Sequence, residues 1–177
     1  MPNTTLPPES RPTIVTATIA QEDLAPFSAL RERFFPAERN YLDAHITLFH
    51  HIPAGVREHF LAFARDQFRR QPTFWADVRP PVSLGGGVAY PVGGDELFAV
   101  RRRLRREFEG HLNAQDLRPW KRPHLTVQNK VAKEEADRLL RHLSARFEPC
   151  RLRVLGLSFY RYDYGPWTRL GEAAFSG

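Results

Sequence analysis

The chain has 177 residues, 42% of them hydrophobic, with 26 Lys and Arg against 20 Asp and Glu. This length and the mixed charge favour one folded domain and exclude a largely disordered chain. No apolar run reaches the roughly 18 residues of a membrane span, and the single cysteine excludes an intramolecular disulfide framework. The formal net charge of +6 indicates anionic partners such as phosphates or nucleic acid, although most basic residues are Arg, a bias that genome composition also produces.

The first half of the chain alternates predicted strands and helices. Residues 1–11 contain neither the charged nor the apolar region of a secretory signal, and we expect a disordered lead-in to a single domain over 12–177. Together with the lone cysteine, this favours a cytoplasmic location. The polarity pattern then predicts, in order, a strand over 13–20, a helix over about 24–34, a strand from His45, a helix over 55–69 and a strand over 74–80.

The second half repeats this order of elements. We predict, in order, a strand over 86–92, a helix over 94–110, a strand from His124, a helix over 133–147, a strand over 151–162 and a last strand over 167–175. Residues 13–80 and 86–160 therefore read as an internal repeat. We expect an α+β fold of two pseudo-symmetric lobes, each an antiparallel sheet with helices on its outer face, and an active cleft between the lobes.

One tetrapeptide pattern occurs once in each half. His45-Ile46-Thr47-Leu48 and His124-Leu125-Thr126-Val127 both read His, apolar, Thr, apolar. Side chains alternate between the two faces of a strand, so His and Thr of each copy are expected on one face and the apolar residues in the core. The same alternation places Phe49 and His51 on the first polar face, and Gln128 and Lys130 on the second.

Two histidines on opposed strands suit a reaction that removes one proton and delivers another near neutral pH. Transfer at a phosphodiester is such a reaction, and two threonine hydroxyls would stabilise the charge on the non-bridging oxygens. A single His-x-Thr is more often structural, but its repetition favours a shared catalytic role. No third ligand stands at a familiar spacing, so we predict no metal site, and no Ser or Cys lies in a recognisable nucleophile elbow.

The paired motif resembles the 2H phosphoesterase superfamily, in particular the bacterial 2′-5′ RNA ligase family, which includes RNA 2′,3′-cyclic phosphodiesterases. The resemblance covers about residues 12–175, and Pro123 before the second motif fits it as well. It implies catalytic roles for His45 and His124 and phosphate binding by Thr47 and Thr126. It further implies a bilobal cleft and no cofactor. The residues after each motif differ from those of ligase-like members, which affects the expected substrate and not the chemistry.

Further residues near the motifs are candidate substrate contacts. Aromatic rings could stack on a base and the polar or basic groups could contact a phosphate, with core packing or solvated surface as the alternative for each. These candidates are Tyr41, Phe49, His51, Trp120, Arg122, Gln128 and Lys130.

The sequence thus predicts a metal-independent enzyme that hydrolyses 2′,3′-cyclic phosphate ends of RNA or nucleotides, with 2′-5′ RNA ligation as the reverse reaction. Family analogy gives the base role to His124 and the acid role to His45. The alternative is a non-catalytic nucleotide or RNA binding module of the same fold. We expect no membrane association and no obligate protein partner.

Overall fold

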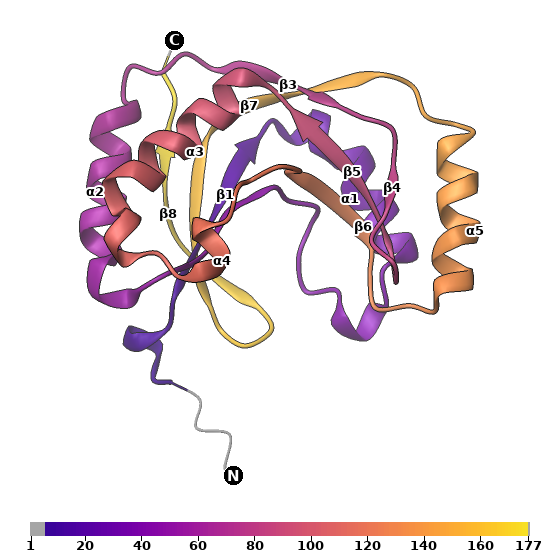
Figure 1. Cartoon of the computed structure of the whole chain (residues 1–177), viewed down its shortest axis with the longest axis horizontal. Helices are drawn as coiled ribbons and strands as arrows, with labels where there is room; N and C mark the ends of the chain where they lie inside the picture. Colours follow the sequence, from indigo (N-terminus) through magenta and orange to yellow (C-terminus); the bar gives the residue numbers. More distant parts are fainter. Residues whose placement is uncertain (1–5, 177) are drawn as a thin grey trace.

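Eight strands form one curved antiparallel sheet at the centre of the molecule (Figure 1). The computed structural model describes residues 6–176. The strands are β1 (Thr13–Ile19), β2 (Thr47–Ile52), β3 (Phe74–Val78), β4 (Val82–Ser83), β5 (Val88–Gly93), β6 (His124–Gln128), β7 (Cys150–Tyr162) and β8 (Trp167–Ala174).

The order of the strands shows that the two halves of the chain exchange partners. The sheet runs β2-β1-β7-β3-β5-β4, with β8 beside β7 and β6 beside β5. The sequence predicts that each repeat, 13–80 and 86–160, forms its own antiparallel sheet, which requires the strands over 74–80 and 151–162 to pair within their own halves. That prediction is wrong, because β3 pairs with β5 of the second half while β7 pairs with β1 of the first.

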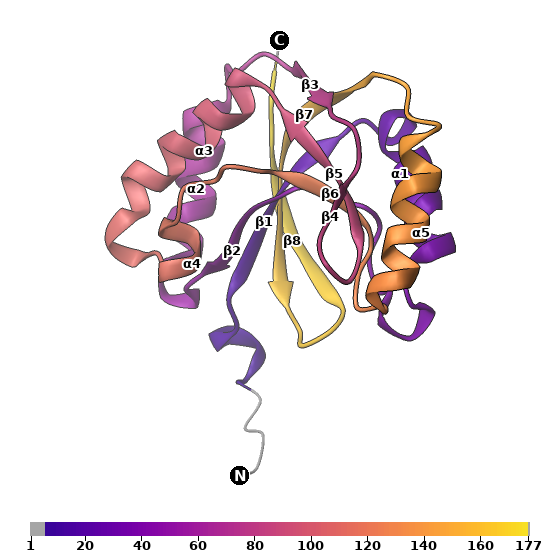
Figure 2. The same cartoon turned by 45° about the vertical axis from the view of Figure 1, so that its right-hand side comes forward.

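The helices are exchanged in the same way. They are α1 (Gln21–Phe34), α2 (Arg57–Phe68), α3 (Asp95–Phe108), α4 (Ala114–Leu117) and α5 (Lys133–Ser144). The ring centroids of Phe60 on α2 and Phe108 on α3 lie 4.6 Å apart, and those of Phe27 on α1 and Tyr90 on β5 lie 5.1 Å apart. Figures 1 and 2 both show α2, α3 and α4 on one side of the sheet's curve and α1 with α5 on the other.

The molecule therefore has two lobes of mixed origin. The first lobe contains β1, β2, β7 and β8 with α2, α3 and α4, and the second contains β3 to β6 with α1 and α5. The predicted α+β class with antiparallel pairing is confirmed. None of the helices in the described part of the chain is long and apolar enough to cross a membrane.

The predicted lead-in over 1–11 lies partly outside the described residues, which begin at Leu6. From there the chain forms a 3-10 turn at Pro8–Ser10. Arg11 follows, and its Nη1 donates to Oδ1 of Asp163 at 2.7 Å. This segment is thereby held against the turn between β7 and β8.

Candidate active site

His45 lies two residues before β2, and its ring is held from two sides. The ring nitrogen Nδ1 lies 2.7 Å from the carbonyl oxygen of Asp43, and the Trp167 ring centroid lies 4.8 Å from that of the imidazole. A carbonyl only accepts hydrogen bonds, so Nδ1 carries the proton. Nε2 of the neutral ring is then the free acceptor.

His124 is the first residue of β6 and is held in the same way. Its Nδ1 lies 2.8 Å from the carbonyl oxygen of Arg122, again two residues before the histidine. Both imidazoles therefore present Nε2 as the atom available for proton exchange. Each histidine lies where a loop enters its strand, two residues before β2 for His45 and at the first residue of β6 for His124.

Thr47 and Thr126 are half-buried, as the predicted alternation requires. Thr47 pairs with Thr16 of β1, and Thr126 pairs with Ala89 of β5. The intervening Ile46 and Leu125 are fully buried in the core. Both copies of the motif thus keep their His and Thr partly accessible while their apolar residues anchor the strand.

A β-bulge follows the threonine of each motif and ends the simple alternation. On β2, Thr47 and Phe49 pair with consecutive residues of β1, and on β6, Thr126 and Gln128 pair with consecutive residues of β5. Leu48 is therefore the inserted residue on β2, and Val127 is the inserted residue on β6. An extra residue reverses the facing of the residues that directly follow it, until a second register shift between Phe49 and Ile52 on β2.

This bulge corrects two of the predicted substrate contacts. Phe49 is fully buried and packs on Phe60, and Gln128 is 2% exposed, with its Nε2 donating to Glu135 at 3.3 Å. Both were expected beside the histidines, and for both that placement is wrong. Each turns into its lobe because one residue has been inserted before it.

The remaining candidates lie at the surface near the motifs. Tyr41 and Arg122 are exposed in the loops before His45 and His124. His51 is exposed at the end of β2, and Lys130 is exposed in a turn with φ 65° after β6. Trp120 is half-buried against Phe98 and Arg101, away from His45 and its pocket.

The surroundings of His45 lower its pKa to about 4. The main cause is burial, which disfavours the charged ring. The positive charges of Arg31, His50 and His124 lower the pKa further, while the hydrogen bond to the carbonyl of Asp43 opposes them. The ring is therefore neutral at pH 7.

Two buried arginines support the motif strands, and the sequence analysis missed both. Arg31 of α1 donates from Nη1 to the carbonyl of Thr126 at 3.0 Å and from Nε to the carbonyl of Leu42 at 2.9 Å. Arg101 of α3 donates from Nε to the carbonyl of Leu48 at 2.9 Å. The helical spacing of apolar residues predicts which apolar side chains are buried, and it assigns every arginine of the helix to the solvent-exposed face. It therefore could not identify Arg31 or Arg101 as buried.

A pocket of about 340 Å³ opens beside His45 on the first lobe. Hydroxyl-bearing side chains of β1 and β7 line it, and Thr18 and Ser158 are hydrogen-bonded to each other at 2.6 Å. Trp167 and Tyr41 contribute aromatic walls. This lining was not predicted from the sequence, although Thr16 and Thr18 lie two residues apart on a strand and therefore share one face.

The described residues contain no group of three or more His, Cys, Asp or Glu side chains that could hold a metal ion. Asp116 of α4 is nevertheless buried beside the first motif. Its carboxylate accepts the backbone N–H groups of His50 and His51 at 2.9 and 2.8 Å. It therefore anchors the end of β2.

Comparison with known proteins agrees with this architecture. The structure resembles TT0787 of Thermus thermophilus, with a TM-score of 0.66 at 17% identity over 94% of this chain and 98% of that one. It resembles E. coli LigT complexed with 3′-AMP, with a TM-score of 0.64 at 17% identity over 95% and 99%. No curated protein matches the sequence significantly. A family model described as the 2′-5′ RNA ligase superfamily matches residues 18–166, and the chain belongs to this superfamily of 2H phosphoesterases.

Proposed function

We propose that this chain is a metal-independent phosphoesterase that hydrolyses 2′,3′-cyclic phosphate ends of RNA or nucleotides. The observation that carries the proposal is the matched pair of histidines, each with Nδ1 held by a carbonyl two residues upstream. Membership of the superfamily supports it. So do the complexes of E. coli LigT with 3′-AMP and with phosphate, although the low identity makes these a likeness of fold alone.

The proposed reaction needs one base and one acid. One Nε2 takes a proton from water as its oxygen bonds to phosphorus, and the other imidazole gives a proton to the ribose oxygen whose bond to phosphorus breaks. The hydroxyls of Thr47 and Thr126 donate to the non-bridging oxygens, where negative charge grows. An RNA 5′-hydroxyl in place of water would form a 2′-5′ bond instead, which is the ligase reaction.

We assign the base role to His45 and the acid role to His124, the reverse of the assignment by family analogy. The lowered pKa of His45 keeps its Nε2 unprotonated at neutral pH, as a base requires. The guanidinium of Arg31 lies close enough to oppose protonation of that ring. Its own pKa, lowered to about 10 by burial, still leaves it charged, so it also favours an anionic substrate.

The pocket beside His45 would take the terminal nucleoside. At about 340 Å³ it lies at the small end of ligand sites, which suits one nucleoside. Trp167 and Tyr41 offer faces for a base, and the paired hydroxyls of Thr18 and Ser158 offer hydrogen bonds to polar edges. A cytoplasmic location would place the enzyme with RNA.

The direct test is hydrolysis of nucleoside 2′,3′-cyclic phosphates by the purified protein in the presence of a chelator. We expect turnover, a loss of about 10²–10⁴ in rate for His45→Ala and for His124→Ala, and little further loss in the double variant, because the two rings act together. His111→Ala, at an exposed histidine outside the site, is the control. Binding without turnover by the wild type would establish the non-catalytic alternative.

A second experiment separates the two roles. A phosphodiester whose leaving group is a nitrophenolate needs no proton, so it should restore the rate of the variant that lacks the acid and not of the one that lacks the base. We expect rescue of His124→Ala. Rescue of His45→Ala instead would restore the assignment by family analogy.

A further inference from the structure

Another hollow lies apart from the pocket beside His45, between α3 and the segment that leads from α4 into β6. Its volume is about 310 Å³. Two aromatic side chains, Phe98 and Trp120, meet edge to face within it at 5.5 Å. Arginines supply half of its lining. Such a combination of ring faces and cations differs from the hydroxyl-rich pocket beside His45.

The arginines of this hollow fall into two kinds. Arg101 is 6% exposed and already engaged, since its Nε donates to the carbonyl of Leu48 and its Nη2 to that of Asp116. Its guanidinium carbon lies 5.3 Å from the centroid of the Trp120 ring. Arg102 and Arg118 are exposed and form no ion pair among the described residues.

Two other groups define the charge at the hollow's rim. Arg105 is partly neutralised by Glu109 at 3.1 Å. The carboxylate of Asp116 faces away from the hollow, since it accepts the backbone N–H groups of His50 and His51. Arg102 and Arg118 are thus the cations left available for an anion.

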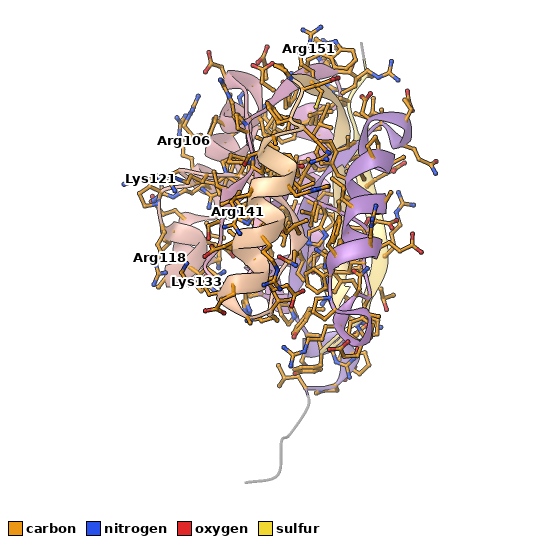
Figure 3. All side chains as sticks on the ribbon, turned by 90° about the vertical axis from the view of Figure 1, so that its right-hand side faces the viewer. Arg106, Arg118, Lys121, Lys133, Arg141 and Arg151 are labelled. Carbon is orange, nitrogen blue, oxygen red and sulfur yellow. The ribbon has the colours of Figure 1, made fainter. Side chains whose placement is uncertain are left out.

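The positive charge continues from the hollow towards the second motif. Lys121 and Arg122 are exposed and occupy the positions between Trp120 and the His124 motif. Figure 3 shows Arg106, Lys121 and Arg118 along one edge of the molecule. Four residues of chain span at most about 14 Å, so Trp120 lies within a few nucleotides of the proposed catalytic ring.

We propose that this hollow, lined by Phe98, Arg102, Leu117, Arg118, Pro119 and Trp120, binds the single-stranded RNA that precedes a cyclic phosphate end. An aromatic face for a base next to arginines for phosphates is the pattern by which proteins hold single strands. The charge argues against an apolar protein segment as occupant. The inference rests on the proposed function, and it makes RNA, not a free nucleotide, the preferred substrate.

The first test measures binding, which needs no turnover. Fluorescence anisotropy would follow a labelled oligoribonucleotide ending in a 3′-phosphate, with the double variant Arg102→Glu and Arg118→Glu. We expect at least about tenfold weaker binding at low salt. The slope of log Kd against log salt should fall by about 1.4, because each lost phosphate contact on a single strand contributes about 0.7.

The matched control is the pair Arg138→Glu and Arg141→Glu on α5, which makes the same change in net charge at exposed arginines of the other lobe that form no ion pair within residues 6–176. It should leave the salt slope unchanged. Trp120→Leu should weaken binding without changing the slope, since stacking releases no counterions, and its thermal midpoint would show that it folds. Equal weakening by both charge-reversed pairs would mean general attraction only and would overturn the proposal.

The second test separates this site from the catalytic one. The Arg102 and Arg118 double variant should raise KM for a cyclic-phosphate-ended oligoribonucleotide about tenfold and leave hydrolysis of a nucleoside 2′,3′-cyclic phosphate unchanged. Wild-type protein inactive on both substrates would reject the proposed function. Wild-type activity on both, with an unaltered KM for the oligonucleotide in the variant, would reject the RNA site alone.

Discussion

At the scale of single residues, the two histidines share a hydrogen bond but differ in their surroundings. Each Nδ1 lies within hydrogen-bond distance of the carbonyl two residues upstream, so both rings keep Nε2 free. His45 is additionally covered by Trp167 and lies near the buried charge of Arg31. Pseudo-symmetry in the sequence therefore does not extend to the chemistry of the two rings.

The lowered pKa of His45 has a consequence for stability. Between its unfolded value of 6.5 and about 4, the unfolded chain binds a proton at this residue and the folded protein does not. Stability should therefore fall as the pH drops through that window. His45→Gln removes the titration, so its urea midpoint should fall less than that of the wild type between pH 7 and pH 5.

The strongly shifted carboxylate of Asp163 does not contribute to the loss of stability between pH 7 and pH 5. Asp163 has its pKa held far below the ordinary value of 3.8 by hydrogen bonds from Arg161, Thr168 and Arg11, so its contribution is lost only at more acidic pH. Parallel loss of stability in the wild type and in His45→Gln between pH 7 and pH 5 would show that His45 is not desolvated in the folded protein.

At the scale of elements, the sequence predicted the regular strands and helices well and the irregular ones not at all. A strand over 13–20 and a helix over 94–110 were visible because their side chains alternate or repeat over several turns. The bulges after Thr47 and Thr126 each insert one residue into a strand, and the alternation of polar and apolar residues does not reveal such an insertion. This is why Phe49 and Gln128, which follow the two bulges, were placed on the wrong strand face.

Helix α4 is the element that fixes the end of the first motif strand. It has four residues, too few for a periodic signal, yet Asp116 within it is 1% exposed. Burial alone would raise the pKa of Asp116, but hydrogen bonds from the His50 side chain and from the N–H groups of His50 and His51 hold it below 3.8. The carboxylate is therefore ionised and bonded to β2 at neutral pH.

Removing this carboxylate should destabilise the protein more than removing the helix cap. Asp116→Ala leaves two backbone N–H groups of β2 without their partner, at an expected cost of about 2–3 kcal/mol. Asn113→Ala loses only the cap, where the Asn113 side chain accepts from the N–H of Asp116, at about 1 kcal/mol. Urea unfolding of both variants gives the comparison. Equal costs would show that Asp116 acts as part of α4 alone and does not hold β2.

At the scale of the whole molecule, the exchange of elements between halves ties the two lobes together. β3 and α1 belong to the first half of the chain but pack in the second lobe, whereas β7 and α3 belong to the second half but pack in the first lobe. Repeats in a sequence predict that two units are similar, but they do not say which unit a strand joins. The choice depends on long-range packing, such as Phe27 on Tyr90, which has no local signature.

Arg31 is the residue through which this exchange reaches the candidate site. It belongs to α1, and its guanidinium contacts the loop before His45 at the carbonyl of Leu42 and the second motif strand at the carbonyl of Thr126. One rigid planar group thus joins the segments that carry the two catalytic candidates. Arg101, its counterpart on α3, bonds to Leu48 and Asp116, which both lie in the first lobe.

This difference predicts that Arg31 positions the two histidines and Arg101 does not. Lysine keeps the charge but lacks the planar fork of donors, so Arg31→Lys should lose alignment between the lobes and about 10²-fold in kcat, as a displacement of roughly 1 Å can cause. Arg101→Lys should lose comparable stability with a much smaller loss of kcat.

Arg31→Met also removes the charge that lowers the pKa of His45, so the acidic limb of kcat/KM against pH should move to higher pH. Steady-state kinetics across pH, together with urea midpoints, measure all three effects. Two results together would show that Arg31 is only a structural residue. In the first, kcat falls in proportion to the loss of stability in both lysine variants. In the second, the acidic limb of kcat/KM stays at the same pH in Arg31→Met.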